Sequence, residues 1–202
     1  MNPRILAQAV RRPVYTGRLV LYRLYELSHP NEPWIAQGAI RFLDAELDRQ
    51  GTGLEWGSGR STQWFGARSR HLTTVEHDHR WAEEIRGRLA RARVENVELV
   101  ETPLDHPESE GTRPVYEVEP RYVAVARRFG DASLSFVLVD GHYRQACIRA
   151  VLGKLRPGGL LVLDNSDWLP REEWGVPKEW LVVHESRNVR TQTTIWRKPA
   201  AG

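Results

Sequence analysis

Short apolar segments alternate along the chain with longer segments whose apolar residues recur every three to four positions. The clearest apolar run is 135–140, a continuous stretch typical of a strand at the centre of a parallel sheet that is covered on both faces. The segment 79–92 instead carries Trp81, Ile85 and Leu89 at helical spacing. This alternation predicts an α/β fold with a doubly wound, mostly parallel sheet.

The same patterns place the remaining elements. Strands are predicted at 52–56, 72–76, 96–100, 135–140, 160–163, 180–185 and 191–197, and helices at 19–27, 32–49, 60–69, 79–92, 121–128 and 144–156. Residues 107–120 are rich in Pro, Glu and Gly, which indicates a surface insertion. We expect one domain over 1–202, in which 1–49 form a helical cover before an α/β core at 50–198.

Composition narrows the range of partners and compartments. The net charge of +3 comes from arginines scattered among acids, so we expect no nucleic-acid partner. No apolar run approaches the roughly 20 residues of a membrane span, and residues 1–10 do not resemble a signal peptide. Cys147 is the only cysteine and cannot form an internal disulfide, which favours the cytoplasm. Its place on an apolar helix face predicts a core residue.

A glycine-rich turn connects the strand at 52–56 with the helix that follows. Gly57 and Gly59 can adopt positive φ angles and allow a ligand to approach the backbone at a helix N-terminus. The next strand ends in Glu76, about 20 residues beyond the glycines, where an acid binds ribose hydroxyls in dinucleotide-binding units. Thr62 stands where such units have a third glycine, which disfavours NAD and favours another nucleoside cofactor. The alternative is a tight turn without a ligand.

Two motifs carry a resemblance to a known family. The run Glu55-Trp56-Gly57-Ser58-Gly59 resembles the first motif of class I S-adenosylmethionine-dependent methyltransferases, and Leu155–Asn165 resembles their turn and fifth strand. The resemblance implies a Rossmann-like sheet of seven strands with a C-terminal antiparallel hairpin. It also implies that the glycine turn approaches the methionine part of the cofactor and that Glu76 binds its ribose. The cofactor-binding candidates are Glu55, Gly57, Ser58, Gly59, Ser61, Thr62, Glu76, His77, Trp81 and Asp140.

The catalytic candidates, Asp140 and His142, directly follow the apolar run at 135–140. Ligands of open α/β sheets bind at the carboxyl ends of the strands, so both residues are expected at the site of chemistry. His142 is the candidate base because the unperturbed pKa of histidine is near neutrality, and Asp140 could orient it. A histidine in a turn after a strand, without a catalytic role, is the competing interpretation.

Oxygen ligands at two strand ends suggest a divalent cation. Asp140, Asp164 and Asn165 suit Mg²⁺, and the pattern is similar to the catechol O-methyltransferase group. That group usually has a lysine where this chain has Tyr143. This difference weakens the resemblance for both the catalytic base and the metal ligands. The predicted function is S-adenosylmethionine-dependent methylation of a small molecule, at oxygen rather than nitrogen. The alternatives are a nucleotide-dependent oxidoreductase and a cofactor-binding protein without catalysis. The N-terminal helices could serve a homodimer.

Overall fold

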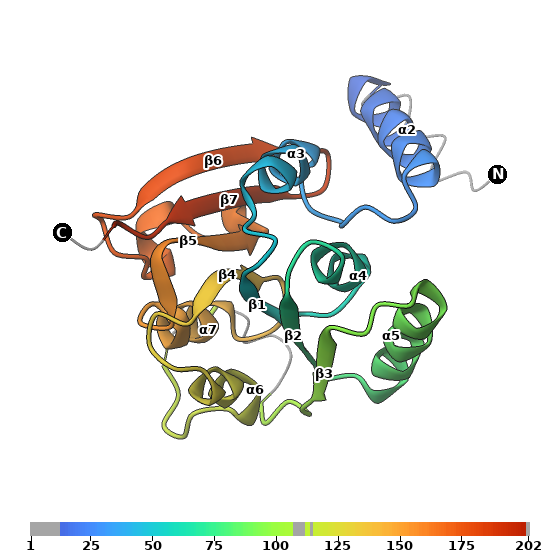
Figure 1. The fold of residues 1–202 in the computed structure, drawn as a ribbon. Helices are drawn as coiled ribbons and strands as arrows, with labels where there is room; N and C mark the ends of the chain where they lie inside the picture. The colour runs from blue at the N-terminus through green and yellow to red at the C-terminus, as the bar shows by residue number, and fades with distance from the viewer. Residues whose placement is uncertain (1–12, 107–111, 114, 201–202) are drawn as a thin grey trace.

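Seven strands form a single sheet in the order β3-β2-β1-β4-β5-β7-β6 in the computed structural model, which describes residues 13–106, 112–113 and 115–200 (Figure 1). The strands are β1 Thr52–Trp56, β2 His71–Glu76, β3 Val97–Glu101, β4 Leu134–Val139, β5 Leu155–Asp164, β6 Leu181–Arg187 and β7 Gln192–Arg197. The first five are parallel, and β7 pairs antiparallel with both β5 and β6. The predicted fold class is therefore confirmed, including its C-terminal hairpin.

The strand order reverses between β1 and β4. From β1 the chain continues outward through β2 to β3, and it then returns to pair β4 on the other side of β1. Ligands of open α/β sheets bind outside the carboxyl ends of the strands at such a reversal. The topology therefore places a binding crevice beyond Trp56 and Val139, the last residues of β1 and β4.

Helices cover both faces of the sheet. They are α2 Pro13–Ser28, α3 Gln37–Glu46, α4 Arg60–Gly66, α5 His79–Ala92, α6 Arg121–Ala124 and α7 Arg144–Val151, with short 3₁₀ turns η2 Val125–Arg128, η3 Ser166–Trp168 and η4 Arg171–Trp174. Alternate residues of β4 belong to separate cores: Phe136 packs with α3 and α4, and Val137 packs with α6 and α7. Cys147 is fully buried in the second core, as predicted.

Three predicted helices are shorter in the structure, and the one expected over 60–69 ends at Gly66. The helix expected over 144–156 ends at Val151, because Leu155 is buried and pairs with Leu134, so that β5 already begins there. The segment 155–159, predicted as a turn, forms the irregular start of β5, where Gly158 has a φ of +75°. The helix expected over 32–49 begins only at Gln37, after an extended, buried segment.

Helix α2 stands apart from the rest of the fold (Figure 1). Tyr22 is its only buried side chain among residues 14–28, whereas Val14, Leu21, Leu24 and Leu27 are all more than half exposed. None of the helices in the described ranges combines the length and apolarity that a membrane span requires. The N-terminal helix is therefore the part of the described chain with the least packing.

Candidate functional site

A cavity of about 670 Å³ opens at the carboxyl ends of β1, β2 and β4, where the strand order reverses. Its lining comprises Gly57, Glu76, His77, Asp78, Trp81, Thr112, Tyr122, Asp140, Gly141, His142, Arg144 and Trp168. The structure thus brings together the predicted residues Gly57, Glu76, His77, Trp81 and His142. Asp140 lies with them. A volume of this size falls within the range of small-ligand sites.

Gly57 is a position that only glycine fits. Its φ is +92°, in the left-handed region that side chains avoid. A Cβ there would lie 2.9 Å from both the carbonyl carbon of Asp140 and the backbone nitrogen of Gly141. The end of β1 therefore touches the loop after β4, and the backbone of Gly57 itself forms part of the cavity wall.

Glu76 is held by the backbone around it. Its Oε2 accepts hydrogen bonds from the Ser58 hydroxyl (2.7 Å) and the Ser58 backbone (3.2 Å), while Oε1 accepts from the backbone nitrogens of His77 (2.8 Å) and Asp78 (2.9 Å). The carboxylate is almost fully buried and still borders the cavity. It therefore joins the glycine turn to the end of β2 and faces the ligand space with a fixed orientation.

Three predicted cofactor ligands support the glycine turn from behind. Glu55 is fully buried, and its Oε2 accepts hydrogen bonds from the hydroxyls of Thr62 (2.6 Å) and Thr74 (2.7 Å). Thr62 in turn accepts a hydrogen bond from the backbone of Gly59 (2.9 Å). Glu55, Thr62 and the buried Ser61 are not among the residues that line the cavity, so their placement does not support direct cofactor contact.

The environment of Glu55 favours its neutral form. Burial raises the pKa of Glu55 to about 7, and the nearby Glu76 adds to the rise, although the surrounding hydroxyls lower it. The acid behind the glycine turn, Glu55, is therefore buried with one carboxyl oxygen, Oε1, that has no hydrogen-bond partner among the described residues.

Trp81 and His77 form one side of the cavity. The indole nitrogen of Trp81 donates to the carbonyl of Ser58 (2.7 Å), which fixes the ring beside the glycine turn, and the Arg88 guanidinium lies over it at 4.9 Å. The His77 Nδ1 lies 3.0 Å from Glu76. Both side chains therefore stand where a nucleoside bound at Glu76 would contact them, and their predicted roles stay predictions.

The catalytic candidates Asp140 and His142 both line the cavity. Asp140 accepts a hydrogen bond from the Arg144 guanidinium at 3.1 Å. His142 packs edge-to-face against His77, with ring centroids 4.4 Å apart. Burial raises the pKa of Asp140, and Arg144 opposes that rise. The roles of His142 as base and of Asp140 as its orienting acid stay predictions.

The predicted metal ligands are engaged by protein groups. Asp164 is buried and accepts hydrogen bonds from the hydroxyls of Thr191 (2.8 Å) and Thr193 (2.6 Å), while the Asn165 amide donates to Thr191 (2.9 Å). The Arg144 guanidinium donates to the carbonyls of Asp164, Gly141 and Asp140. An arginine thus connects the two strand ends where Mg²⁺ was expected.

The described residues contain no group of three or more His, Cys, Asp or Glu side chains that could hold a metal ion. Asp164 and Asn165 also do not line the cavity. Burial, together with the nearby Asp140, raises the pKa of Asp164, and the hydroxyls of Thr193 and Thr191 oppose the rise. The structure therefore gives no support to the Mg²⁺ hypothesis.

Six wall residues were not predicted as site residues: Asp78, Thr112, Tyr122, Gly141, Arg144 and Trp168. Tyr122 packs against Gly141, and its backbone carbonyl accepts a hydrogen bond from the indole of Trp56 (2.9 Å). Trp168 lies over the Arg144 guanidinium at 4.4 Å. The aromatic content of the loop after β5 hints at Trp168, but no sequence signal points to Tyr122, whose position depends on tertiary packing.

Comparison with solved structures identifies the fold. A methyltransferase from Geobacter sulfurreducens is 12% identical with a TM-score of 0.59, covering 98% of this chain and 97% of its own. The cofactor-bound protein Rv0187 from MTB is 19% identical with a TM-score of 0.57, covering 100% and 99%. An RNA methyltransferase from Salinibacter ruber in complex with S-adenosyl-L-homocysteine is 14% identical with a TM-score of 0.52, covering 80% and 90%.

No family model and no curated protein matches the sequence. At these identities the structural likeness defines the fold, which is that of class I S-adenosylmethionine-dependent methyltransferases. Because one similar structure is an RNA methyltransferase, the comparisons do not support the expected exclusion of nucleic acid. The acceptor has to be argued from the site itself.

Proposed function

We propose that this chain is an S-adenosylmethionine-dependent methyltransferase that acts on a small molecule, at oxygen rather than nitrogen. The observation that carries the proposal is the pairing of Gly57 and Glu76 at one cavity. A position that only glycine fits and a fixed carboxylate meet where the strand order reverses. The likeness to methyltransferase structures, including two bound to S-adenosylhomocysteine, supports it.

The residues present fit the cofactor. The Gly57 turn would contact its methionine part, the Glu76 carboxylate its ribose hydroxyls, and the Trp81 ring its adenine. S-adenosylmethionine, when bound, supplies a methyl group: its bond to sulfur breaks as the acceptor atom bonds to carbon, the acceptor proton passes to a base, and S-adenosylhomocysteine remains. Placing the acceptor in line with that bond is the main contribution a protein makes.

His142 is the proposed base. Histidine side chains commonly act as general bases at neutral pH, so His142 can take the proton of a phenol-like oxygen. The contact between His142 and His77 holds the ring at the cavity wall. Arg144 holds Asp140 at the same cavity, and Tyr122 and Trp168 form part of its wall.

Charge in the cavity favours a small molecule over RNA. The lining carries three carboxylates, those of Glu76, Asp78 and Asp140, and one arginine whose guanidinium is already bound to backbone carbonyls. A surface for nucleic acid would instead place unpaired Lys and Arg along the path of the phosphates. We also propose a cytoplasmic location, because the single cysteine, Cys147, is buried and forms no disulfide.

Calorimetric titration with S-adenosylhomocysteine tests the cofactor site. We expect micromolar binding by the wild type and a loss of roughly 10- to 100-fold in Glu76→Ala, the effect of removing a charge-assisted hydrogen-bond acceptor. Glu101→Ala is the matched control, because Glu101 ends the neighbouring strand β3 in register with Glu76 and lies outside the cavity. Equal losses in both variants, or no binding by the wild type, would refute the assignment.

The same titration separates the alternatives. Binding of NAD in place of S-adenosylhomocysteine would indicate an oxidoreductase, and cofactor binding without any methyl transfer would indicate a binding protein. Because Arg144 occupies the expected metal position, we expect the affinity to be the same with Mg²⁺ and with a chelator. A gain with Mg²⁺ would restore the metal hypothesis for Asp140, Asp164 and Asn165.

A further inference from the structure

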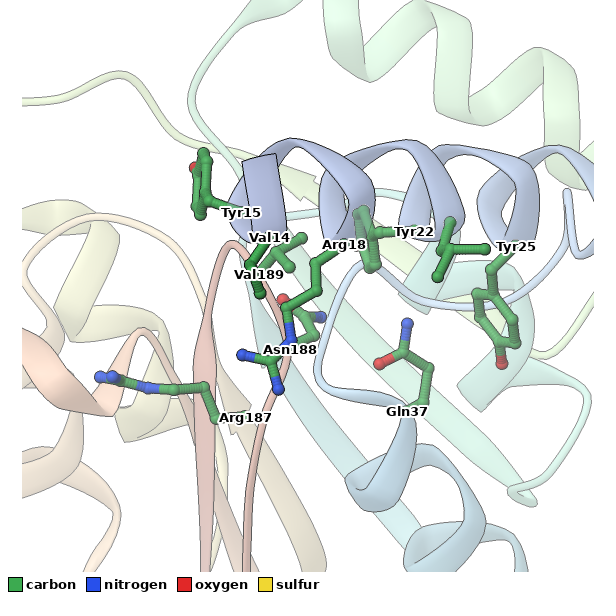
Figure 2. Close-up of a pocket in the computed structure, with 10 residues that line it drawn as sticks. Val14, Tyr15, Arg18, Tyr22, Tyr25, Gln37, Arg187, Asn188 and Val189 are labelled. Atoms are coloured by element: carbon green, nitrogen blue, oxygen red, sulfur yellow. The ribbon is translucent and has the colours of Figure 1, made fainter. Parts of the chain in front are cut away.

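Arginines line more than one cavity outside the cofactor site. A cavity of about 980 Å³ lies between helix α2 and the turn that joins β6 to β7 (Figure 2). Its aromatic rings already have partners, because Arg190 lies over the Tyr22 ring at 5.6 Å and the His29 ring stacks on that of Tyr25 at 4.1 Å. A smaller cavity beside the glycine turn has more arginines and fewer internal partners for them.

We call this smaller cavity the arginine pocket. It is formed by the segment before α3 and by helices α4 and α5, and its volume is about 440 Å³, within the range of small-ligand sites. Its lining comprises Pro30, Asn31, Trp34, Gly59, Arg60, Gln63, Arg88, Arg91 and Ala92. Although Gly59 belongs to the glycine turn, no described residue lines both this pocket and the cofactor cavity. The pocket is therefore a separate site.

The lining of the arginine pocket carries three arginines and no acid. Arg88 pairs with Glu84 at 3.1 Å, whereas Arg60 and Arg91 form no ion pair with any carboxylate in the part of the chain that the structure describes. Three guanidinium groups and one paired carboxylate leave two positive charges. Because like charges repel, a bound anion would be attracted to this pocket.

Two of these arginines lie on tryptophan rings. The Arg60 guanidinium lies over the Trp34 ring at 4.8 Å, and the Arg88 guanidinium lies over the Trp81 ring at 4.9 Å. Cation–π contacts of this kind orient a guanidinium without neutralising its charge. Arg91 follows Arg88 by three residues on α5, so both project from the same side of the helix. The pocket thus presents positive groups from two helices to one space.

We propose that the arginine pocket binds the phosphate group of a phosphorylated small molecule. A phosphate monoester carries a charge of about −1.5 to −2 at pH 7, which matches the two uncompensated charges, whereas each phosphate of a nucleic-acid backbone carries only one. Arginine binds phosphate through paired N–H groups, and the amides of Asn31 and Gln63 can donate further hydrogen bonds. This site goes beyond the proposed function and does not depend on it.

Calorimetric titration with phenyl phosphate tests this proposal, in the presence of saturating S-adenosylhomocysteine so that the cofactor cavity is occupied. Methyl phenyl phosphate, which keeps the ring but is a diester with a single negative charge, is the matched probe. We expect phenyl phosphate to bind more tightly than the diester. Arg60→Gln and Arg91→Gln should each weaken phenyl phosphate binding by about 10-fold, because a hydrogen bond between charged groups is lost.

Arg86→Gln is the control on the same helix, since Arg86 pairs with Glu83 and Glu101 and does not line the pocket. It should leave the affinity unchanged. Equal losses in Arg86→Gln and Arg91→Gln, equal affinities for the two probes, or no phenyl phosphate binding would each overturn the proposal. So would tighter binding of a single-stranded oligonucleotide that is lost in the same arginine variants, because the pocket would then be part of a nucleic-acid surface.

Repeating the titration without S-adenosylhomocysteine separates this proposal from the proposed function. The described linings of the two cavities do not overlap, so phenyl phosphate should bind equally well with and without S-adenosylhomocysteine. Binding seen only in its absence would place the phosphate in the cofactor cavity and refute the arginine pocket. If S-adenosylhomocysteine itself failed to bind, the proposed function would be refuted, whereas phenyl phosphate binding that Arg91→Gln weakens would still support the pocket.

Discussion

The candidate cofactor site and helix α2 are built in different ways. At the cofactor site, Gly57 and Glu76 are fixed at strand ends by backbone contacts within the core. Helix α2, by contrast, has one buried side chain among residues 14–28, Tyr22. The fixed region is the one that local sequence motifs reveal.

The largest effect is expected for Gly57→Ala. The new methyl group would lie 2.9 Å from the backbone of Asp140 and Gly141, at a φ of +92°. We expect S-adenosylhomocysteine affinity to fall by about 10- to 100-fold, because left-handed strain alone costs about 1–2 kcal/mol and the contact adds displacement of the cavity wall. Calorimetric titration measures it.

Gly158→Ala separates the effect of backbone strain from the effect of a new steric contact. Gly158 also has a positive φ, +75°, but a Cβ there would meet no atom within 4 Å. It should lower stability slightly and leave cofactor affinity unchanged. If both variants bound the cofactor equally well, Gly57 would be a tight turn without a ligand, the alternative that the sequence left open.

Local patterns predicted most of the fold. The strand at Thr52–Trp56 and the helix at His79–Ala92 have their predicted bounds, because an apolar run or a helical period lies within each segment. Helix α7 ends early because β5 begins at Leu155, in pairing with Leu134 of another strand. The bounds that failed are therefore those set by contacts between segments.

The predictions for the site show the same difference between local patterns and contacts between segments. The presence of Glu76 and His142 at the cavity could be predicted, because Glu76 ends β2 and His142 lies in the turn after β4. The role of Asp164 could not, because the hydroxyls of Thr191 and Thr193 reach it only through the antiparallel register of β5 and β7. The position of Tyr122 likewise depends on its packing against Gly141. Sequence shows which residues stand at strand ends, but not what they contact there.

The next effect concerns the pH dependence of stability through Glu55. Its folded pKa of about 7 lies above the ordinary value of 4.5, so the folded state binds the proton more tightly than the unfolded state does. Its contribution is therefore fully present below pH 4.5 and is lost as pH rises through about 7. Denaturant unfolding across this range should show the free energy of unfolding falling with pH.

Glu55→Gln isolates this contribution. The amide mimics the neutral acid and can still accept the hydrogen bonds from Thr62 and Thr74. Relative to the wild type, the variant should gain on the order of 1–3 kcal/mol between pH 5 and pH 8. Asp140 and Asp164 remain in both proteins, so the difference reports Glu55. A difference that does not vary with pH would mean that this carboxyl is ionised in the fold at all these values.

The smallest effect is expected on α2, and it sharpens the comparison most directly. Leu24 is 57% exposed there, whereas Leu43 of α3 is fully buried. Leu24→Ala should change the free energy of unfolding by less than about 0.5 kcal/mol, while Leu43→Ala should cost about 2–5 kcal/mol. Denaturant unfolding of both variants at several protein concentrations measures the difference. A cost above about 1 kcal/mol for Leu24→Ala that grew with protein concentration would mean that another copy covers α2, because only association makes stability depend on concentration. The exposed face of α2 would then be an interface between copies of the chain.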